Sequence, residues 1–415
     1  MLAIAALFAG ILAMPSARAV VFPDLYSLTV TPDAGGGDMR STAVRLAMRR
    51  LLTRITGVRD PDAAPDLARL IANASSYVSF DGMVDRGRFR VEFYPNQIDE
   101  ALQALGRPVW GPERPLTLLW IAIDAGRGER VLLSDGGISA DTFTDTVGGV
   151  GVSPEAVELA AAIREEIAKV ADERGLPIRF PLLDLEDLLM VTPADIWGGF
   201  VEQIEAASER YGADAILIGR ISADPFGRSV RWTLVHRGEV STFGGTDVVG
   251  GLHGVGDGLG GLAEQGSAGG EPSEAGDDAN PADGGLGAGE DELLPVGEGG
   301  SAVADGLHWV ADRYVQAYSF VGGARTVRLV VRDVSTLNDY GRVLSYLEGL
   351  SALQTIDVEA YEDEGGLLIL RALARGDLAV LEQMVSLGRV LRLDERASSS
   401  VDNTLVLTLA RGSGR

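Results

Sequence analysis

The chain has 415 residues, too many for one ordinary core, so we expect two or three domains of roughly 100–150 residues each. Its 60 acidic and 36 basic residues give a net charge of −24, which argues against nucleic acid and anionic lipid surfaces as partners, because phosphate groups bind surfaces rich in Lys and Arg. The lack of cysteine excludes disulfides, thiolate catalysis, iron–sulfur clusters and cysteine-ligated zinc.

The N-terminus has the pattern of a secretory signal peptide. Residues 2–14 are almost wholly apolar, and Ala17-Arg18-Ala19 places small side chains at the positions that signal peptidase reads. We therefore predict a signal peptide over residues 1–19, cleavage after Ala19 and a periplasmic mature chain without a membrane span. An uncleaved membrane anchor is the competing interpretation, but the apolar run is shorter than the ~20 residues that cross a bilayer.

A first α/β unit is predicted over residues 20–114. Apolar side chains at helical spacing predict a helix over residues 41–56. Its other side carries four arginines that we interpret as a solvated face, namely Arg45, Arg49, Arg50 and Arg54. The remaining elements predicted in this unit are a strand over 25–30, a helix over 66–77, a strand over 88–94 and a helix over 97–105.

A second α/β unit is predicted over residues 115–243, completed by a helix over 301–320. Its first strand, over 116–123, has the continuous apolar run of a strand that is buried on both faces. Ser153-Pro154 begins a long helix that ends at Gly175. A capping box at Thr192 begins another helix, which ends at Gly212. Further strands are predicted over 178–185, 215–221 and 230–235.

The remainder of the chain changes composition twice. Residues 244–300 are rich in Gly, Asp and Glu, so we predict a disordered acidic insertion. Residues 325–415 predict a ferredoxin-like domain with the element order βαββαβ, and a further strand over 404–409 is expected at the edge of its sheet. The fold class is therefore α/β and α+β multidomain, with a small N-terminal α/β unit, a three-layer-like central α/β domain and a C-terminal ferredoxin-like domain.

The candidate functional surface lies in the second unit. Its carboxylates cluster at the carboxyl end of the strand predicted over 178–185, where paired carboxylates bind divalent cations or transfer protons. A structural role remains open, since carboxylates also stabilise the first turns of helices. The members of this surface are Asp184, Glu186, Asp187, Asp195, Trp197 and Arg220.

Other chemistry-bearing residues are sparse. Histidine occurs only at 236, 253 and 308, and two of these positions flank the insertion or fall within it, which disfavours a histidine-centred site. The sequence contains no Gly-x-Ser-x-Gly elbow, His-Glu-x-x-His motif or Walker loop. We therefore assign no catalytic, metal-binding or cofactor-binding residue and expect no cofactor. The larger aromatic side chains that we interpret as core anchors are Trp110, Trp197 and Trp232.

Five short motifs resemble a known family. They are Pro108-Val109-Trp110-Gly111, Pro181-Leu182-Leu183-Asp184-Leu185-Glu186-Asp187, Asp195-Ile196-Trp197-Gly198, Arg210-Tyr211-Gly212-Ala213-Asp214 and Ile218-Gly219-Arg220. In this order they resemble the proteobacterial domain-of-unknown-function family twenty-sixty-six, over residues 21–243 and again from 301 onward. The acidic insertion departs from the family's pattern. The resemblance implies an exported protein without an assigned activity and supplies no catalytic residues.

A weaker similarity links residues 211–219 to envelope-assembly proteins of the curli-secretion and penicillin-binding-protein-activator type. Those relatives are lipoproteins, whereas this chain has no cysteine to carry a lipid. Because the similarity concerns the fold, it does not transfer a function.

These observations favour a periplasmic, non-catalytic adaptor that binds another protein of the cell envelope. Two alternatives stay open. The first is a carboxylate-dependent hydrolase or metal-binding enzyme centred on Asp184, Glu186 and Asp187. The second is a sensor of a small ligand that uses the strand ends of the second unit, where α/β sheets place their clefts.

Overall fold

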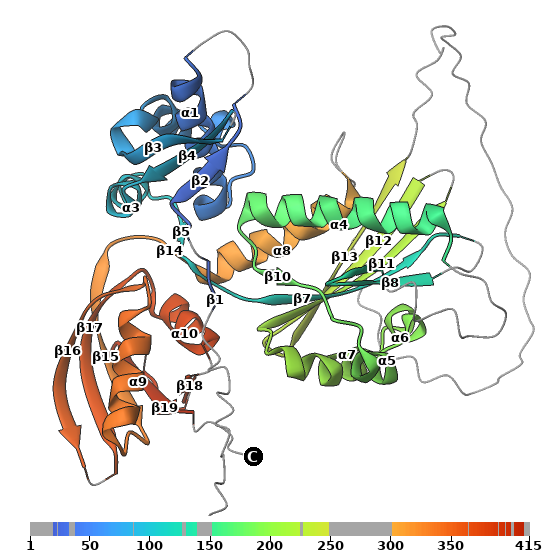
Figure 1. Cartoon of the computed structure of the whole chain (residues 1–415). Coiled ribbons are helices and arrows are strands. Elements are labelled where there is room, and N and C mark those ends of the chain that lie inside the picture. Colours follow the sequence, from blue (N-terminus) through green and yellow to red (C-terminus); the bar gives the residue numbers. More distant parts are fainter. Residues whose placement is uncertain are drawn as a thin grey trace, which may run out of the picture.

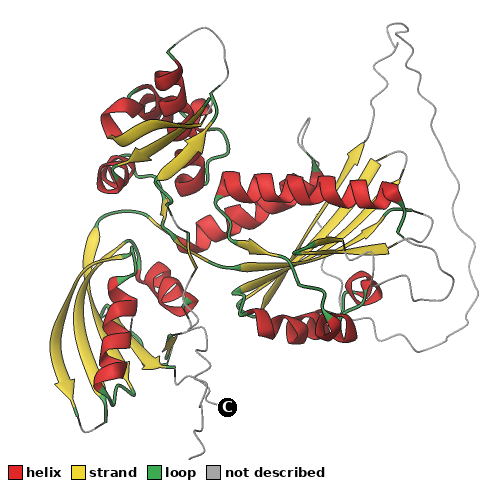
Figure 2. Cartoon of the chain, viewed as in Figure 1, coloured by secondary structure: helices red, strands yellow, loops and turns green. Residues whose placement is uncertain are grey.

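The computed structural model describes residues 20–410 apart from 23, 33–37, 86, 127–129, 139–151, 225–226, 249–300, 364, 389, 395 and 400–401. The predicted signal peptide and nearly all of the predicted insertion lie outside these described residues. The described chain mixes helices with several separate sheets, as the sequence predicted (Figures 1 and 2). None of the helices in this part of the chain combines the length and the apolar character that crossing a bilayer requires.

The N-terminal unit packs helices on one face of a three-stranded antiparallel sheet with the order β2-β4-β3. The helix predicted over 66–77 ends earlier, at Ala72, and a 3-10 turn over 74–77 follows it. Strand β3 was not predicted, because most of its side chains are exposed and two bulges break its alternation. The elements are β2 (Ser27–Val30), α1 (Met39–Thr56), α2 (Pro65–Ala72), β3 (Val78–Asp85), β4 (Arg88–Phe93) and α3 (Pro95–Ala104).

The central sheet has the order β13-β12-β11-β7-β8-β9, with β10 paired to β7. Its strands are β7 (Thr117–Asp124), β8 (Arg130–Ser134), β9 (Gly137–Ile138), β10 (Ile178–Arg179), β11 (Ala215–Asp224), β12 (Gly227–His236) and β13 (Glu239–Val248). Helices α4 (Pro154–Arg174) and α8 (Ala302–Tyr318) cover one face, while α5 (Leu185–Met190), α6 (Pro193–Gly198) and α7 (Val201–Ser208) lie on the other (Figure 1). The helix predicted over 301–320 therefore packs on this sheet.

Three expectations for this sheet were wrong. The strand predicted over 178–185 stops at Arg179, so the carboxylates from Asp184 onward do not stand at a strand end. The helix predicted from Thr192 to Gly212 is divided, because Gly199 adopts the left-handed conformation with a φ of 71° and ends α6. Strand β13 continues to Val248, five residues past the predicted boundary at 243, because its glycine-rich, polar sequence hides the strand.

The C-terminal sheet has the order β16-β17-β15-β19-β18. The predicted βαββαβ element order is present, but the strand over 404–409 is not at the edge. It lies between β15, to which it is parallel, and β18, because its side chains are mostly buried and it is twice as long as β18. The elements are β15 (Ala324–Arg332), α9 (Leu337–Glu348), β16 (Leu353–Glu362), β17 (Leu367–Arg375), α10 (Leu378–Leu387), β18 (Leu391–Leu393) and β19 (Thr404–Leu409).

Two short strand pairs connect segments that are distant in sequence. Strand β1 (Val20–Val21) pairs with β6 (Glu113–Arg114), and β5 (Val109–Trp110) pairs with β14 (Ser319–Phe320). Near these pairs, buried apolar residues of the central sheet, α8 and the C-terminal sheet form one continuous cluster. The central and C-terminal units therefore share a hydrophobic core, whereas the N-terminal sheet has its own.

A buried arginine organises the junction between the units. Arg114 is fully buried and donates hydrogen bonds of 2.9 Å to the backbone oxygens of Arg54, Arg174 and Gly175. These oxygens belong to the ends of α1 and α4, where the helix dipoles place partial negative charge. Burial lowers the pKa of Arg114 to about 9, with a smaller contribution from Arg54, and the group stays protonated at neutral pH. One guanidinium thus holds two helix ends together.

Candidate functional site

The predicted carboxylate cluster surrounds the start of α5. Asp184 caps this helix by accepting a hydrogen bond of 3.1 Å from the backbone N–H of Asp187. Both oxygens of Asp184 also accept hydrogen bonds of 2.7 Å from Arg210, in the bidentate geometry that arginine and carboxylate favour. These hydrogen bonds from Arg210 lower the pKa of Asp184 to about 2. Glu186 lies 3.5 Å from the same guanidinium, so Arg210 offsets part of the negative charge of the cluster.

Asp187 is the buried member of the cluster, with an exposed fraction of 1%. It accepts hydrogen bonds from the Leu183 backbone N–H at 2.9 Å, from Arg210 at 3.1 Å and from the hydroxyl of Tyr211. Burial, together with the bond to Asp187, raises the pKa of Tyr211 to about 12. Both oxygens of this buried carboxylate accept hydrogen bonds from internal donors. These contacts fix α5 on the domain, which gives Asp187 a structural role.

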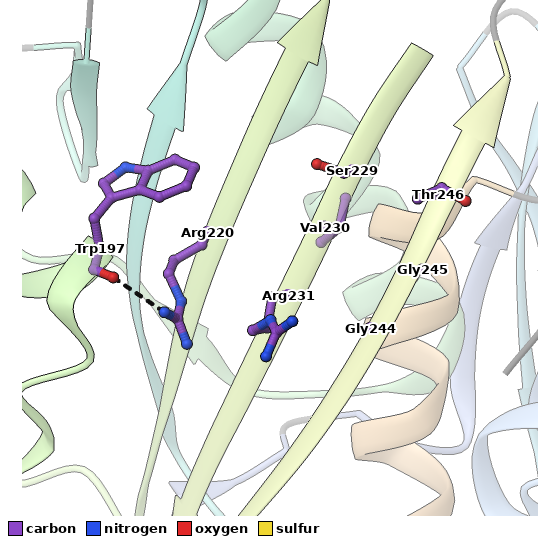
Figure 3. A pocket seen from close by; sticks show the side chains of 8 residues that line it. All are labelled: Trp197, Arg220, Ser229, Val230, Arg231, Gly244, Gly245 and Thr246. Carbon is purple, nitrogen blue, oxygen red and sulfur yellow. Dashed lines mark hydrogen bonds between the residues drawn. The ribbon is translucent and has the colours of Figure 1, made fainter. Parts of the chain in front are cut away.

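The remaining predicted site residues separate into two groups. Asp195 forms the capping box of α6 with Thr192, as its sequence pattern predicted, and has a structural role. Trp197 and Arg220 instead lie together, because an Arg220 Nη1 donates a hydrogen bond of 3.1 Å to the backbone oxygen of Trp197 (Figure 3). Within the described residues, no three His, Asp or Glu side chains are grouped so that they could hold a metal ion.

Trp197 and Arg220 line a cavity of about 280 Å³ on the sheet face that carries α5–α7 (Figure 3). We call this cavity the arginine pocket. It lies where α6 ends and the face of β12 and β13 becomes exposed, so that Trp197 forms a wall and the strands form the floor. Trp197 is partly buried and packs against the core beneath α5–α7, whereas Trp110 and Trp232 are fully buried. The lining residues are Trp197, Arg220, Ser229, Val230, Arg231, Gly244, Gly245 and Thr246.

The register of the sheet explains how the pocket forms. Arg220 on β11 is directly opposite Arg231 on β12, and Arg231 is opposite Gly244 on β13. On its other side Arg220 is beside Ala122 of β7. Two long cationic side chains are therefore flanked in the same row by two very small residues, which leaves the space that the cavity occupies.

Of the residues that line this pocket, the sequence analysis singled out only Trp197 and Arg220. Arg231, Ser229 and Thr246 were not singled out, because β13 was not recognised as a strand. A usable pattern existed, since Arg220 and Arg231 are equally distant from the turn between β11 and β12. In a two-stranded hairpin, residues equidistant from the turn face each other across the ladder.

Of the two histidines in the described part of the chain, one contacts α8 and the other belongs to it. His236 contacts the Tyr318 hydroxyl through Nε2 at 2.7 Å, and His308 belongs to α8 itself. Burial is the main cause that lowers the pKa of each to about 4, with nearby arginines adding to the effect. Both rings are therefore neutral at physiological pH.

The burial of the two histidines predicts that the folded protein loses stability at mildly acidic pH, above the pH values at which most carboxylates become protonated. Between pH 6.5 and about 4 the unfolded chain protonates His236 while the folded chain does not, so the free energy of unfolding should fall as the pH decreases. Urea unfolding at pH 7.5 and 5 measures the effect. His236→Gln, which keeps a donor for Tyr318, should lose less stability between these values than the wild type; an equal loss would contradict the prediction.

The N-terminal unit of the chain matches a known family model. Residues 19–111 match the family model Domain of unknown function (DUF8605). No curated protein matches the chain. Among solved structures, the chain is similar to the LpoB C-terminal domain from Salmonella enterica, at 14% identity over 32% of this chain and 83% of that chain, with a TM-score of 0.18. A likeness at this TM-score carries no argument about function.

Proposed function

We propose that the protein is a non-catalytic binding module of the bacterial cell envelope that docks a partner protein through an apolar surface on its central domain. The observation that carries the proposal is a row of exposed leucines at α5. Leu182, Leu185 and Leu189 have exposed fractions of 55%, 73% and 77%. We call these three residues the leucine ridge. Exposed apolar side chains that gather in one place mark interaction sites on soluble domains.

The ridge stands on a rigid support. Helix α5 has six residues and is too short to be stable alone. It is held by the contacts of Asp184 and Asp187 with Arg210 and Tyr211, so the carboxylate cluster fixes the element that presents the leucines. Leu185 and Leu189 are four residues apart and therefore lie on the same side of the helix. A preformed apolar surface binds without first paying the entropy of ordering itself.

Charge favours a protein over a lipid surface as the partner. Acidic residues, Asp184 and Glu186, flank the leucine ridge, and the whole chain has a net charge of −24. Anionic lipid headgroups would repel such a surface. A partner protein with an apolar groove and basic residues at its rim fits the ridge, because burying one leucine contributes about 1.5–3 kcal/mol.

The envelope location is part of this proposal and rests on the sequence. It is supported by the apolar run and the Ala17-Arg18-Ala19 pattern over residues 1–19. Val20, the expected first residue of the mature chain, begins strand β1, so the fold uses the chain from the predicted cleavage site onward. Membership of the wider family twenty-sixty-six belongs to the same proposal and is supported by the motifs between residues 181 and 220. N-terminal sequencing of the protein from the periplasmic fraction should give Val20; intact Met1 on a cytoplasmic protein would overturn the location.

Photocrosslinking in cells tests the docking surface. A photoreactive residue at position 189 should give a crosslinked product of defined mass, and Leu182→Ser with Leu185→Ser should remove that product while the unfolding midpoint stays unchanged. Leu337 is the matched control, because it is 87% exposed in the C-terminal domain, and the same photoreactive residue there should not give the product. A product that survives the two serine substitutions, or that forms equally from position 337, would refute the docking role of the ridge.

A further inference from the structure

Strand β3 of the N-terminal unit is an exposed edge that carries large apolar side chains. It lies at the end of the sheet order β2-β4-β3 and, among the described residues, pairs with β4 alone. Phe80, Met83 and Val84 have exposed fractions of 53%, 63% and 55%. Figure 1 shows this strand on the side of the unit that faces away from the central domain. An open edge of this kind presents unpaired backbone donors and acceptors to any strand that reaches it.

The features that usually protect an edge strand are weak in β3. Charged side chains often block edge pairing, but both carboxylates of this strand are held by arginines of their own chain. Asp81 accepts a hydrogen bond of 2.7 Å from Arg40 Nη2, and its side chain is only 11% exposed. Asp85 pairs with Arg88. The two bulges lie toward the ends of the strand, so residues 80–83 pair regularly with β4 and the middle of the edge is open.

The distribution of charge along the chain allows this unit to approach a second copy of itself. Residues 20–114 contain 12 arginines, no lysine and 12 Asp or Glu residues, so the unit has no formal net charge. The acidic excess that gives the chain its net charge of −24 is therefore carried by the rest of the sequence. Because like-charged surfaces repel, two copies of the chain meet with least repulsion through their N-terminal units.

The centre of β3 is suited to pairing with itself. Gly82 has no Cβ, and the Phe80 ring lies beside it, since a Cβ built there would be 3.1 Å from Phe80 Cζ. When two β3 strands pair antiparallel with Gly82 opposite Gly82 of the second copy, the two rings meet across the two-fold axis. This register places Asp81 opposite Met83. Shifting one strand by two residues would place Asp81 opposite Asp81, and like charges at opposed positions destabilise a strand pair.

We propose that two copies of the protein form a symmetric dimer by antiparallel pairing of their β3 strands around Gly82. The two three-stranded sheets then join into one six-stranded antiparallel sheet with the order β2-β4-β3-β3-β4-β2. Main-chain hydrogen bonds hold the two strands together, and their side chains set the register. The two-fold pairing uses both open β3 edges, so the assembly closes at two copies. This interface is separate from the leucine ridge and does not depend on it.

Sedimentation equilibrium of the chain over residues 20–415 tests the dimer. In ~0.15 M salt, which screens charges more than about 8 Å apart, the wild type at micromolar concentrations should have twice the mass of one chain. Phe80→Lys should be monomeric, because a lysine on an edge strand opposes pairing. Phe80 is half exposed, so circular dichroism should show the wild-type secondary structure. Val240→Lys is the matched control and should remain dimeric, since Val240 has the same exposed fraction of 53% and lies in β13, the edge strand of the central sheet.

Disulfide crosslinking tests the register, because the chain contains no cysteine of its own. Gly82→Cys places two thiols opposite each other at the axis, within the Cα separation of about 4.4–6.8 Å that disulfides require, so mild oxidation should give a covalent dimer. The exposed ring of Phe80 can turn aside for the new side chain. Ser79→Cys is the matched control: it is exposed on the same strand, but the register separates the two copies of this position by about 20 Å, so it should not crosslink.

Several outcomes would overturn the dimer. The mass of a single chain for the wild type is the first, and a dimer that Phe80→Lys leaves intact is the second. Loss of the dimer in Leu182→Ser with Leu185→Ser would assign self-association to the leucine ridge instead. Equal crosslinking of Gly82→Cys and Ser79→Cys would contradict the register, and growth beyond two copies would contradict a closed assembly. Phe80-dependent binding of another envelope protein by a monomeric chain would assign the edge to that partner and refute the proposal.

Discussion

Replacing Arg114 with methionine should lower the free energy of unfolding by about 3–5 kcal/mol. The guanidinium donates to the backbone oxygens of Arg54, Arg174 and Gly175, and these oxygens are buried at the ends of α1 and α4. Methionine fills a similar volume but donates no hydrogen bond, so the oxygens lose their partners in a place that water does not reach. The ring of Trp110, 3.8 Å from the guanidinium, loses a cation–π contact as well.

Urea unfolding, followed by far-ultraviolet circular dichroism, measures this change. Arg114→Lys should have an intermediate effect, because an ammonium group cannot match the planar fork that reaches both helix ends. Arg40→Met is the matched control: Arg40 is 68% exposed in its ion pair with Asp81, and solvent screens such a pair, so its loss should change the stability little. An unchanged unfolding midpoint for Arg114→Met would show that the junction does not depend on this residue.

The same junction shows where sequence reasoning stops. The long helices were predictable because their apolar stripes and caps are local, as in α4, which begins at Ser153 and ends at Gly175. The burial of Arg54 was not, and its interpretation as part of a solvated face was wrong. Its side chain is buried because it hydrogen-bonds Asp172 at 2.8 Å, a residue 118 positions away. A contact between units leaves no periodic pattern in either segment.

Strand order was unpredictable for a similar reason. The segment over 404–409 was recognised as a strand from its composition, but pairing partners depend on competition for the exposed edge of β15. The candidate site contains residues that a local motif identifies and residues that only the pairing of strands brings together. Trp197 and Arg220 were found from local motifs, whereas Arg231 became relevant only through the register of β11 and β12. The carboxylates were singled out from a local motif, but Arg210, which pairs with them, and Tyr211, which hydrogen-bonds Asp187, follow more than 20 residues later.

Gly306→Ala should destabilise the central domain although alanine is the better helix former. Gly306 lies inside α8, where propensity alone would favour alanine by about 0.8–1 kcal/mol. A Cβ at this position would overlap Nε1 and Cδ1 of the Trp232 indole. Trp232 is fully buried and cannot move toward the sheet, because the backbone of Gly219 lies directly beneath it; a Cβ built there would be 2.5 Å from the indole Cζ3. Overpacking of this kind costs about 1–3 kcal/mol, so it exceeds the gain in propensity.

Gly341→Ala provides the matched control for this substitution. Gly341 is also inside a helix, α9, but a Cβ there meets no atom within 4 Å, so only the propensity acts and the free energy of unfolding should rise by about 0.5–1 kcal/mol. The two substitutions are chemically identical and should change stability in opposite directions. Thermal unfolding of both variants measures this difference. If Gly306→Ala raised the melting temperature as Gly341→Ala does, α8 could not lie as close to Trp232 as the fold requires, and the packing of α8 on the central sheet would have to be different.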